Sequence, residues 1–334
     1  MLAVLLQWDY GRKSRGESLE NICFLPAISA LVEKVDVFWY DDLLDNSQLL
    51  QNRLKDRICT IRPDLVFFLP LSEEFPPEFV KEISSKVPTF CWFGDDQWRF
   101  DSYTFRYAHC FSHVSTTDPR SIKKYNAIGI DPILTQWAAH RLSSDTTPLR
   151  YDRQYRYDVS FIGGANRYRK WFIDFLAASG VTVECFGSGW SNGRVDFIEM
   201  EDIFRTSRIN LNLSNSVNHD LRFVFGGLAN VVSFLRSPKR VEQMKARNFE
   251  IPLAGGFELT NFVPGLDFYF RIGEEIGIYS TPDDCVSQIR YYLDATERRE
   301  QIAWAGYVRA MNEHTYEHRL QAIFSRIWDP SKEL

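Results

Sequence analysis

A basic segment in the second half of the chain lies immediately before a glutamate and a pair of glycines. Residues 236–247 hold one acid, Glu242, and five basic side chains, in a chain whose net charge is -5. The basic side chains are Arg236, Lys239, Arg240, Lys245 and Arg247. Glu250 follows, and then Gly255 and Gly256. A carboxylate can accept two hydrogen bonds from a ribose diol while basic groups balance a diphosphate. The segment therefore fits a bound sugar nucleotide; the alternative is a solvated helix face.

Three glutamates in this part of the chain, Glu242, Glu250 and Glu258, recur at intervals of eight residues. On a continuous helix, residues eight positions apart lie on nearly the same side, but Gly255 and Gly256 interrupt a helix before Glu258. We therefore rank Glu250 first and Glu258 last as contacts to a ligand.

A second group of polar residues follows the predicted strand 159–162. Gly163 and Gly164 come directly after it, and Arg167 and Arg169 follow at the start of a predicted helix. Ligands of open α/β sheets bind outside the carboxyl ends of the strands, near helix N-termini. The glycines would let a ligand approach the backbone, and either arginine could meet a phosphate. The alternative is an ordinary turn, and the Gly-x-Gly-x-x-Gly dinucleotide pattern is absent.

Two loops of the first half follow strands in the same way. Asp9, Gly11 and Arg12 come after the predicted strand 2–7, and Asp95 and Asp96 come after the predicted strand 89–93. Neighbouring acids on an extended chain point to opposite sides, which disfavours a shared metal ion. These residues thus also lie where ligands of open α/β sheets bind. The alternative for both acids is a helix cap or a plain loop.

Strand-like and helix-like stretches alternate along the whole chain, which predicts an α/β fold with parallel sheets. Further predicted strands are 35–40, 65–69, 181–186 and 209–213, and the predicted helices include 19–32, 49–61, 75–85, 169–179 and 314–328. A polar stretch without apolar periodicity separates two halves. The predicted organisation is a first domain at 1–145, a linker at 146–157, a second domain at 158–314 and a terminal helix segment at 315–334.

The whole-chain composition excludes several classes of protein. The chain has 334 residues, of which 45% are hydrophobic and 25% charged, a composition typical of globular proteins. Acidic residues outnumber basic ones, which argues against a nucleic-acid binder. The six cysteines are scattered without metal-ligand spacing, so we expect reduced thiols and no metal site. No apolar run reaches the length of a transmembrane helix, and we expect a cytoplasmic protein. A nucleophile elbow and a phosphate-binding Walker loop are also absent.

The stretch from Lys245 to Gly256, KARNFEIPLAGG, resembles the C-terminal half of CgeB-like glycosyltransferases, relatives of the group 1 set with the GT-B fold. The resemblance is good over roughly 155–325 and looser in the first half, at 89–96 and 125–129. Other residues that carry it are Val159 to Gly163, Arg169, Phe270, Glu274 to Ile276, Tyr279, Ile302 to Gly306, His314 to Tyr316 and Arg319.

This resemblance implies two Rossmann-like domains facing a cleft, with the C-terminal helix packing back on the N-terminal domain. It implies that Glu250 holds the nucleotide ribose, that Glu242 lies near the donor sugar and that Arg169 lies near the diphosphate. It also implies an acceptor site in the first half, where we expect Asp9, Gly11, Arg12 and Asp96, with Asp95 as a general base if the reaction inverts the sugar carbon. The family's Pro-Phe-Gly after the first acid is replaced here by Gln243 to Lys245. Such enzymes generally need no metal and no cofactor, because basic side chains and a helix dipole neutralise the leaving diphosphate.

The sequence thus predicts a metal-independent glycosyltransferase that moves a sugar from a UDP-, GDP- or dTDP-activated donor to an unidentified acceptor. That acceptor could be a glycan, a lipid-linked molecule, a protein or a small molecule. One alternative is a sugar-nucleotide epimerase of the same fold, and another is a catalytically idle module that binds a sugar or a nucleotide.

Overall fold

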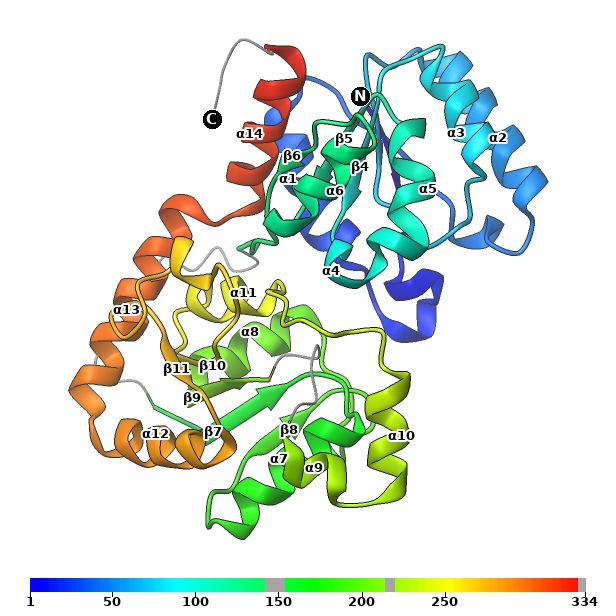
Figure 1. The fold of residues 1–334 in the computed structure, drawn as a ribbon. Coiled ribbons are helices and arrows are strands. Elements are labelled where there is room, and N and C mark those ends of the chain that lie inside the picture. The colour runs from blue at the N-terminus through cyan, green and yellow to red at the C-terminus, as the bar shows by residue number, and fades with distance from the viewer. Residues whose placement is uncertain (142–153, 214–219, 330–334) are drawn as a thin grey trace. The chain divides into compact units, whose positions relative to one another are not determined.

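The computed structural model describes residues 1–141, 154–213 and 220–329 (Figure 1). The chain divides into two compact units, each built on its own sheet. Unit 1 comprises Met1–Trp137 and the C-terminal segment from Tyr316, and unit 2 comprises Ala138–Thr315. Of the expected linker 146–157, residues 146–153 lie outside the described ranges. No helix within those ranges is both long and apolar enough to cross a membrane.

The sheet of unit 1 is parallel, with strand order β2-β1-β3-β4-β5-β6. Its strands are β1 (Leu2–Leu5), β2 (Asp36–Trp39), β3 (Val66–Phe68), β4 (Thr89–Phe93), β5 (His113–Thr116) and β6 (Ile133–Leu134). Every residue of β1, β3 and β4 is buried. Strands covered on both faces read as nearly continuous apolar runs, which is why these three are visible in the sequence.

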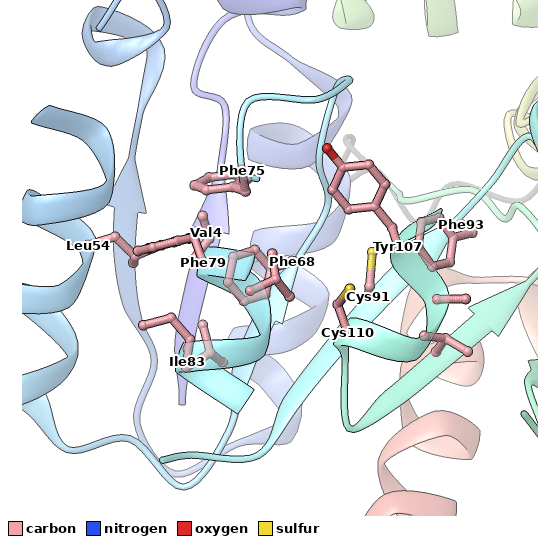
Figure 2. Packing of buried hydrophobic residues seen from close by; sticks show 14 of the residues in the cluster. Val4, Leu54, Phe68, Phe75, Phe79, Ile83, Cys91, Phe93, Tyr107 and Cys110 are labelled. Atoms are coloured by element: carbon pink, nitrogen blue, oxygen red, sulfur yellow. The ribbon is translucent and has the colours of Figure 1, made fainter. Parts of the chain in front are cut away.

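Helices cover the faces of this sheet. They are α1 (Leu25–Leu31), α2 (Ser47–Ile61), α3 (Pro77–Ser84), α4 (Asp96–Arg99), α5 (Phe105–Tyr107), α6 (Ile122–Ala127) and α14 (Tyr316–Trp328). Figure 2 shows the core that joins α2 and α3 to the strands, where Leu54 and Phe79 meet Val4 and Phe68. The C-terminal helix α14 packs against α1 as expected, and the Tyr316 ring lies 4.5 Å from that of Phe24.

Unit 2 also contains a parallel sheet, with strand order β11-β10-β9-β7-β8. Its strands are β7 (Tyr157–Ile162), β8 (Glu184–Phe186), β9 (Ser207–Asn212), β10 (Glu258–Asn261) and β11 (Gly277–Tyr279). Its helices are α7 (Arg167–Ala178), α8 (Phe197–Thr206), α9 (Leu221–Phe225), α10 (Leu228–Arg236), α11 (Arg247–Leu253), α12 (Pro282–Asp294) and α13 (Thr296–Glu313). Side chains of α7 and α12 pack on one face of the sheet, and those of α8 and α11 on the other.

The α/β class with two parallel sheets is confirmed. The alternative interpretation of the basic segment as a solvated helix face does not apply to residues 237–246, which form no helix: α10 ends at Arg236 and α11 begins at Arg247. Glu242 therefore lies in a connection and Glu250 in a helix, so the eight-residue spacing reflects no shared helical face.

Candidate functional site

The carboxyl ends of β7 and β9 form one edge of the unit 2 sheet, and the glycines predicted there occupy it. Gly163 follows β7, and its carbonyl oxygen accepts a hydrogen bond of 2.8 Å from the Trp190 indole. A Cβ at this position would lie 2.9 Å from the Phe161 ring and 3.1 Å from the Arg169 guanidinium. A side chain would therefore displace Arg169. Gly164 has nothing within 4 Å of its Cβ position, which leaves its backbone open to a ligand.

Arg169 joins the ends of the two strands. Its guanidinium donates hydrogen bonds to the carbonyl oxygens of Gly164, at 2.9 Å, and of Leu213, at 2.6 Å. Asn166 caps α7 by accepting a hydrogen bond from the Arg169 backbone N–H at 2.8 Å. Burial, together with the nearby positive charge of Arg247, lowers the pKa of Arg169 to about 10. Arg169 thus remains a cation at neutral pH, while Arg167 is exposed at the first position of α7.

Arg247 and Glu250 occupy the first turn of α11, close to this edge. The Arg247 guanidinium donates to the Glu250 carboxylate and lies 5.4 Å above the Phe204 ring. Both side chains reach solvent in part, with exposed fractions of 25% and 11%. Arg247 lies near enough to lower the pKa of Arg169. Two cations and one carboxylate therefore converge at the carboxyl edge of the sheet.

The chain around Lys245 is held by a buried polar network. The Asn248 side-chain oxygen accepts a hydrogen bond of 3.2 Å from the Lys245 backbone N–H. Glu258 Oε1 accepts hydrogen bonds from Asn248 Nδ2, at 2.9 Å, and from Asn212 Nδ2, at 2.8 Å. In the described part of the chain Glu258 Oε2 has no hydrogen-bond partner. Glu258 is 1% exposed, and its burial raises the pKa to about 8, so the carboxyl is neutral at physiological pH.

Glu258 was ranked last as a contact to a ligand. In the structure it supports the site from within this hydrogen-bond network. It connects the end of β9 to the turn that carries Lys245 and Arg247. The sequence showed no signal for this supporting role, because the partners Asn212 and Asn248 come from two other segments. Glu242 is half-buried, and its negative charge contributes to raising the pKa of Tyr168 and of Tyr279.

Gly255 and Gly256 do not lie at this edge, in contrast to the donor-binding position expected for them. They follow the C-terminal end of α11 and precede β10, so they lie at the amino edge of the sheet. A helix that returns between parallel strands runs antiparallel to them, which separates its two ends by the height of the sheet. A Cβ on Gly256 would lie 2.5 Å from Asn210 Nδ2 and 2.8 Å from the Phe204 carbonyl oxygen. The pair therefore serves the packing of α11 and β10.

In unit 1, Asp96 also differs from the expected acceptor-side role. It is 1% exposed, and its carboxylate accepts hydrogen bonds from Thr104 and Thr116 at 2.6 Å and from Tyr125 at 2.8 Å. Burial raises its pKa to about 6 against the opposing effect of these donors. Asp95 is half-buried before α4, and its backbone oxygen accepts hydrogen bonds from the first turn of that helix.

The loop after β1 contains the other residues predicted for the acceptor side. Asp9 forms an ion pair of 2.9 Å with Arg15, and Arg12 is exposed. Gly11 has a φ of +68°, a conformation that favours glycine. The sequence analysis missed Glu20, which is partly buried in the same region. Its burial raises the pKa to about 7, a value suited to general-base chemistry. The available signal was an acid within the apolar periodicity of 19–32.

Within the described ranges, no group of three or more histidine, cysteine, aspartate and glutamate side chains is arranged to hold a metal ion.

The part of the chain that contains this site is similar to known proteins. Residues 167–325 match a protein family described as glycosyl transferase-like. No curated protein sequence matches the chain at a significant level. The matched segment contains Arg169, Lys245, Arg247 and Glu250, and thus most of the polar edge of unit 2.

Solved structures resemble the chain over nearly its whole length. A sucrose-phosphate synthase from Thermosynechococcus elongatus has a TM-score of 0.64 at 9% identity, covering 98% of this chain and 99% of that one. Anabaena HepE, crystallised with UDP and glucose, has a TM-score of 0.58 at 12% identity, with 98% of each chain covered. A glycosyltransferase from Rickettsia africae has a TM-score of 0.58 at 10% identity, again with 98% of each chain covered. The chain therefore has the GT-B fold, and its residues 167–325 are similar to glycosyltransferase-like proteins.

Proposed function

We propose that the protein is a glycosyltransferase, of the CgeB-like type, that moves a sugar from a nucleotide-activated donor to an acceptor. One observation carries the proposal: Arg169, Arg247 and Glu250 converge at the carboxyl edge of the unit 2 sheet, inside the segment that matches the glycosyl transferase-like family. Two cations beside an open glycine backbone suit a diphosphate, and a partly exposed carboxylate suits a ribose diol.

In this proposal each group has one task. Glu250 keeps free acceptor positions beyond its bond to Arg247, because a carboxylate can accept about four hydrogen bonds. Those positions take the ribose hydroxyls, while Lys245, Arg247 and Arg169 balance the diphosphate and Gly163 and Gly164 admit it. Glu242 contacts the donor sugar.

Breaking the bond between the sugar and the diphosphate leaves negative charge on the leaving phosphate. Fixed cations stabilise that charge more in the transition state than in the bound donor, which accelerates the step without a metal ion. The proton of the acceptor hydroxyl must be removed, and we assign that task to Asp95 if the reaction inverts the sugar carbon. HepE was crystallised with UDP and glucose, which makes UDP-sugars the first donors to test.

The test is calorimetric titration of UDP, GDP and dTDP into the wild type, Glu250→Ala and the matched control Glu297→Ala. Glu297 is exposed in the first turn of α13, away from the polar edge. We expect Glu250→Ala to weaken nucleotide binding by about tenfold or more, since a charge-assisted hydrogen bond contributes about 1.5–3 kcal/mol, and Glu297→Ala to match the wild type. Unchanged affinity of Glu250→Ala for all three nucleotides would contradict the assignment.

Incubation with the matching nucleotide sugars then separates the three activities. Acceptor-dependent transfer supports the proposal. Isomerisation of the donor sugar without an acceptor would indicate an epimerase. Binding without turnover across glycan, lipid-linked, protein and small-molecule acceptors would indicate an idle binding module.

A further inference from the structure

The helices α9 and α10 carry an apolar stripe that faces solvent. It consists of five side chains whose exposed fractions are 67%, 76%, 87%, 45% and 64%: Leu221, Phe225, Leu228, Val232 and Leu235. The last three follow the spacing i, i+4, i+7, which places them on one side of α10. Scattered exposed apolar residues are common on protein surfaces, but exposed apolar residues that recur on one side of each of two consecutive helices point to a docking surface.

The stripe is presented by two consecutive helices, of which α9 is anchored by buried side chains. On the inner side of α9, the buried ring of Phe223 lies 5.3 Å from the ring of Tyr168 and 5.7 Å from that of Trp171. Asn230 Nδ2 donates a hydrogen bond of 2.9 Å to the Phe223 carbonyl oxygen and so ties α10 to α9. Figure 1 shows both helices beside α7, which their contacts confirm. The inner side of α9 is thus packed against α7, α10 is tied to α9, and the stripe remains exposed.

Positive charge accompanies the stripe. Residues 221–241 contain four basic side chains and no acid, although the chain as a whole has a net charge of -5. One of the four, Arg222, is paired with Asp220 and Asp283. Arg236 is exposed at the end of α10. The Arg240 guanidinium lies at the same helix end, 3.4 Å from the Phe234 carbonyl oxygen and 3.3 Å from that of Leu235. Cations therefore border the end of the apolar stripe.

We propose that the apolar stripe docks on an anionic lipid surface, with Arg236 and Arg240 against the headgroups. An apolar helix face bordered by Lys and Arg is the pattern of helices that lie in the membrane interface. Each basic residue near an anionic surface adds to the attraction. A second copy of the chain is a poorer occupant, because it would bring the same cations against these cations. The inference does not depend on the proposed transferase activity.

The experiment is sedimentation of the full-length protein with phosphatidylcholine vesicles that contain or lack phosphatidylglycerol. We expect binding only to the vesicles with phosphatidylglycerol, and weaker binding at high salt. Leu228→Ser with Leu235→Ser should reduce the partition coefficient by about tenfold or more, because both leucines leave water on docking. Arg236→Gln with Arg240→Gln should reduce it as well and remove most of the salt dependence.

The matched control is Ile198→Ser, which removes an exposed isoleucine, 75% exposed, from α8 of the same unit. It should bind vesicles like the wild type. Circular dichroism and the unfolding midpoint should show that every variant is folded; these surface changes leave the inner contacts of Phe223 intact. Absence of binding by the wild type, or equal binding by the double leucine variant, would overturn the proposal. A dimer in light scattering that the leucine variant abolishes would assign the stripe to a second copy instead.

Discussion

The carboxyl edges of the two parallel sheets differ in how their polar side chains are satisfied. In unit 1 the buried Asp96 accepts hydrogen bonds from three hydroxyl groups, all of which belong to the same unit. In unit 2, Arg169 and Arg247 converge and keep part of their surface available to solvent. The same kind of sheet thus has one carboxyl edge with a buried carboxylate bonded within its own unit, and another with charged side chains open to solvent. The residues, and not the fold, therefore indicate where a phosphate can bind.

Each unit also contains a carboxyl group that is only 1% exposed, Asp96 in unit 1 and Glu258 in unit 2, and the two have different partners. Asp96 has three donors distributed over both oxygens, and its pKa rises to about 6. Glu258 has two amide donors on a single oxygen, and its pKa rises to about 8. Hydrogen bonds to a carboxylate favour the ionised form, and burial favours the neutral one. Burial outweighs the donors in both units, and with fewer donors the pKa of Glu258 rises further above its ordinary value than that of Asp96 does.

The largest expected effect is on the stability of unit 1. Asp96→Ala leaves the hydroxyls of Thr104, Thr116 and Tyr125 without their acceptor, which should lower the free energy of unfolding by about 3 kcal/mol. Urea unfolding measures this loss, and UDP affinity should stay unchanged. Asp101→Ala is the control, since Asp101 is exposed and forms an ion pair with Lys124. A loss no greater than that of the control would mean that the Asp96 network does not stabilise the unit.

The next effect concerns the charged edge. Arg247→Met should weaken the binding of UDP, GDP or dTDP by about tenfold to a hundredfold, because a charge-assisted hydrogen bond contributes about 1.5–3 kcal/mol. Arg12→Met removes an exposed arginine from the edge of unit 1 and should leave this affinity unchanged. Calorimetry of both variants tests the contrast. Equal losses would show that nucleotide binding does not distinguish the two edges.

A smaller effect is the pH dependence of stability. The folded-state pKa of Glu258 is about 8, above its ordinary value of 4.5, so the folded protein retains a proton that the unfolded chain releases. The stabilisation from this retained proton is fully present below pH 4.5 and is lost as the pH rises through 8. Glu258→Gln should therefore flatten the decline of the unfolding free energy between these values and be more stable than the wild type at pH 9.

Asp96→Asn provides the comparison for this profile. The pKa of Asp96 rises from its ordinary value of 3.8 to about 6, so Asp96 lowers the unfolding free energy between these pH values. Asp96→Asn should therefore flatten the decline only on the acid side. Urea midpoints measured from pH 4 to pH 9 separate the two windows. Identical profiles for the two variants would contradict the difference between the buried carboxyls.

The smallest expected effect is at the surface of unit 1. Arg15→Gln breaks the ion pair between Arg15, whose side chain is 35% exposed, and Asp9, whose side chain is 26% exposed. Exposed pairs of this kind contribute less than about 1 kcal/mol, so the thermal midpoint should change little. A change as large as that of Asp96→Ala would show that the loop after β1 is as firmly held as the buried network.

The sequence predicted those parts of the fold that depend on local patterns. Buried apolar runs revealed β1, β3 and β4, and the residues after β7 were predicted at the edge where they lie. β5, β6, β10 and β11 were missed; in β5 and β10 the buried polar residues Ser115, Thr116, Glu258 and Thr260 interrupt the apolar pattern. Of these, Thr116 and Glu258 bond to side chains from distant segments, Asp96 and Asn212.

The same limit applies to the candidate site. The motif from Lys245 to Glu250 is contiguous and could be recognised, whereas the burial of Asp96 depends on Thr104, Thr116 and Tyr125, which follow it at intervals of up to 29 residues. Gly255 and Gly256 were predicted beside a ligand because they follow Glu250 in sequence. Their distance from the edge results from the reversal of direction between α11 and β10.

The position of α14 has a consequence for biosynthesis. Unit 2 is one continuous stretch, whereas unit 1 includes a helix that begins only at Tyr316. On the ribosome, the whole of unit 2 emerges before the helix that packs on α1 is made, although domains tend to fold in the order in which they are synthesised. Until then the side of α1 next to Phe24 lacks its cover. The N-terminal unit is therefore the last to be completed, and a chain that stops before Tyr316 would carry an open core in the unit that was made first.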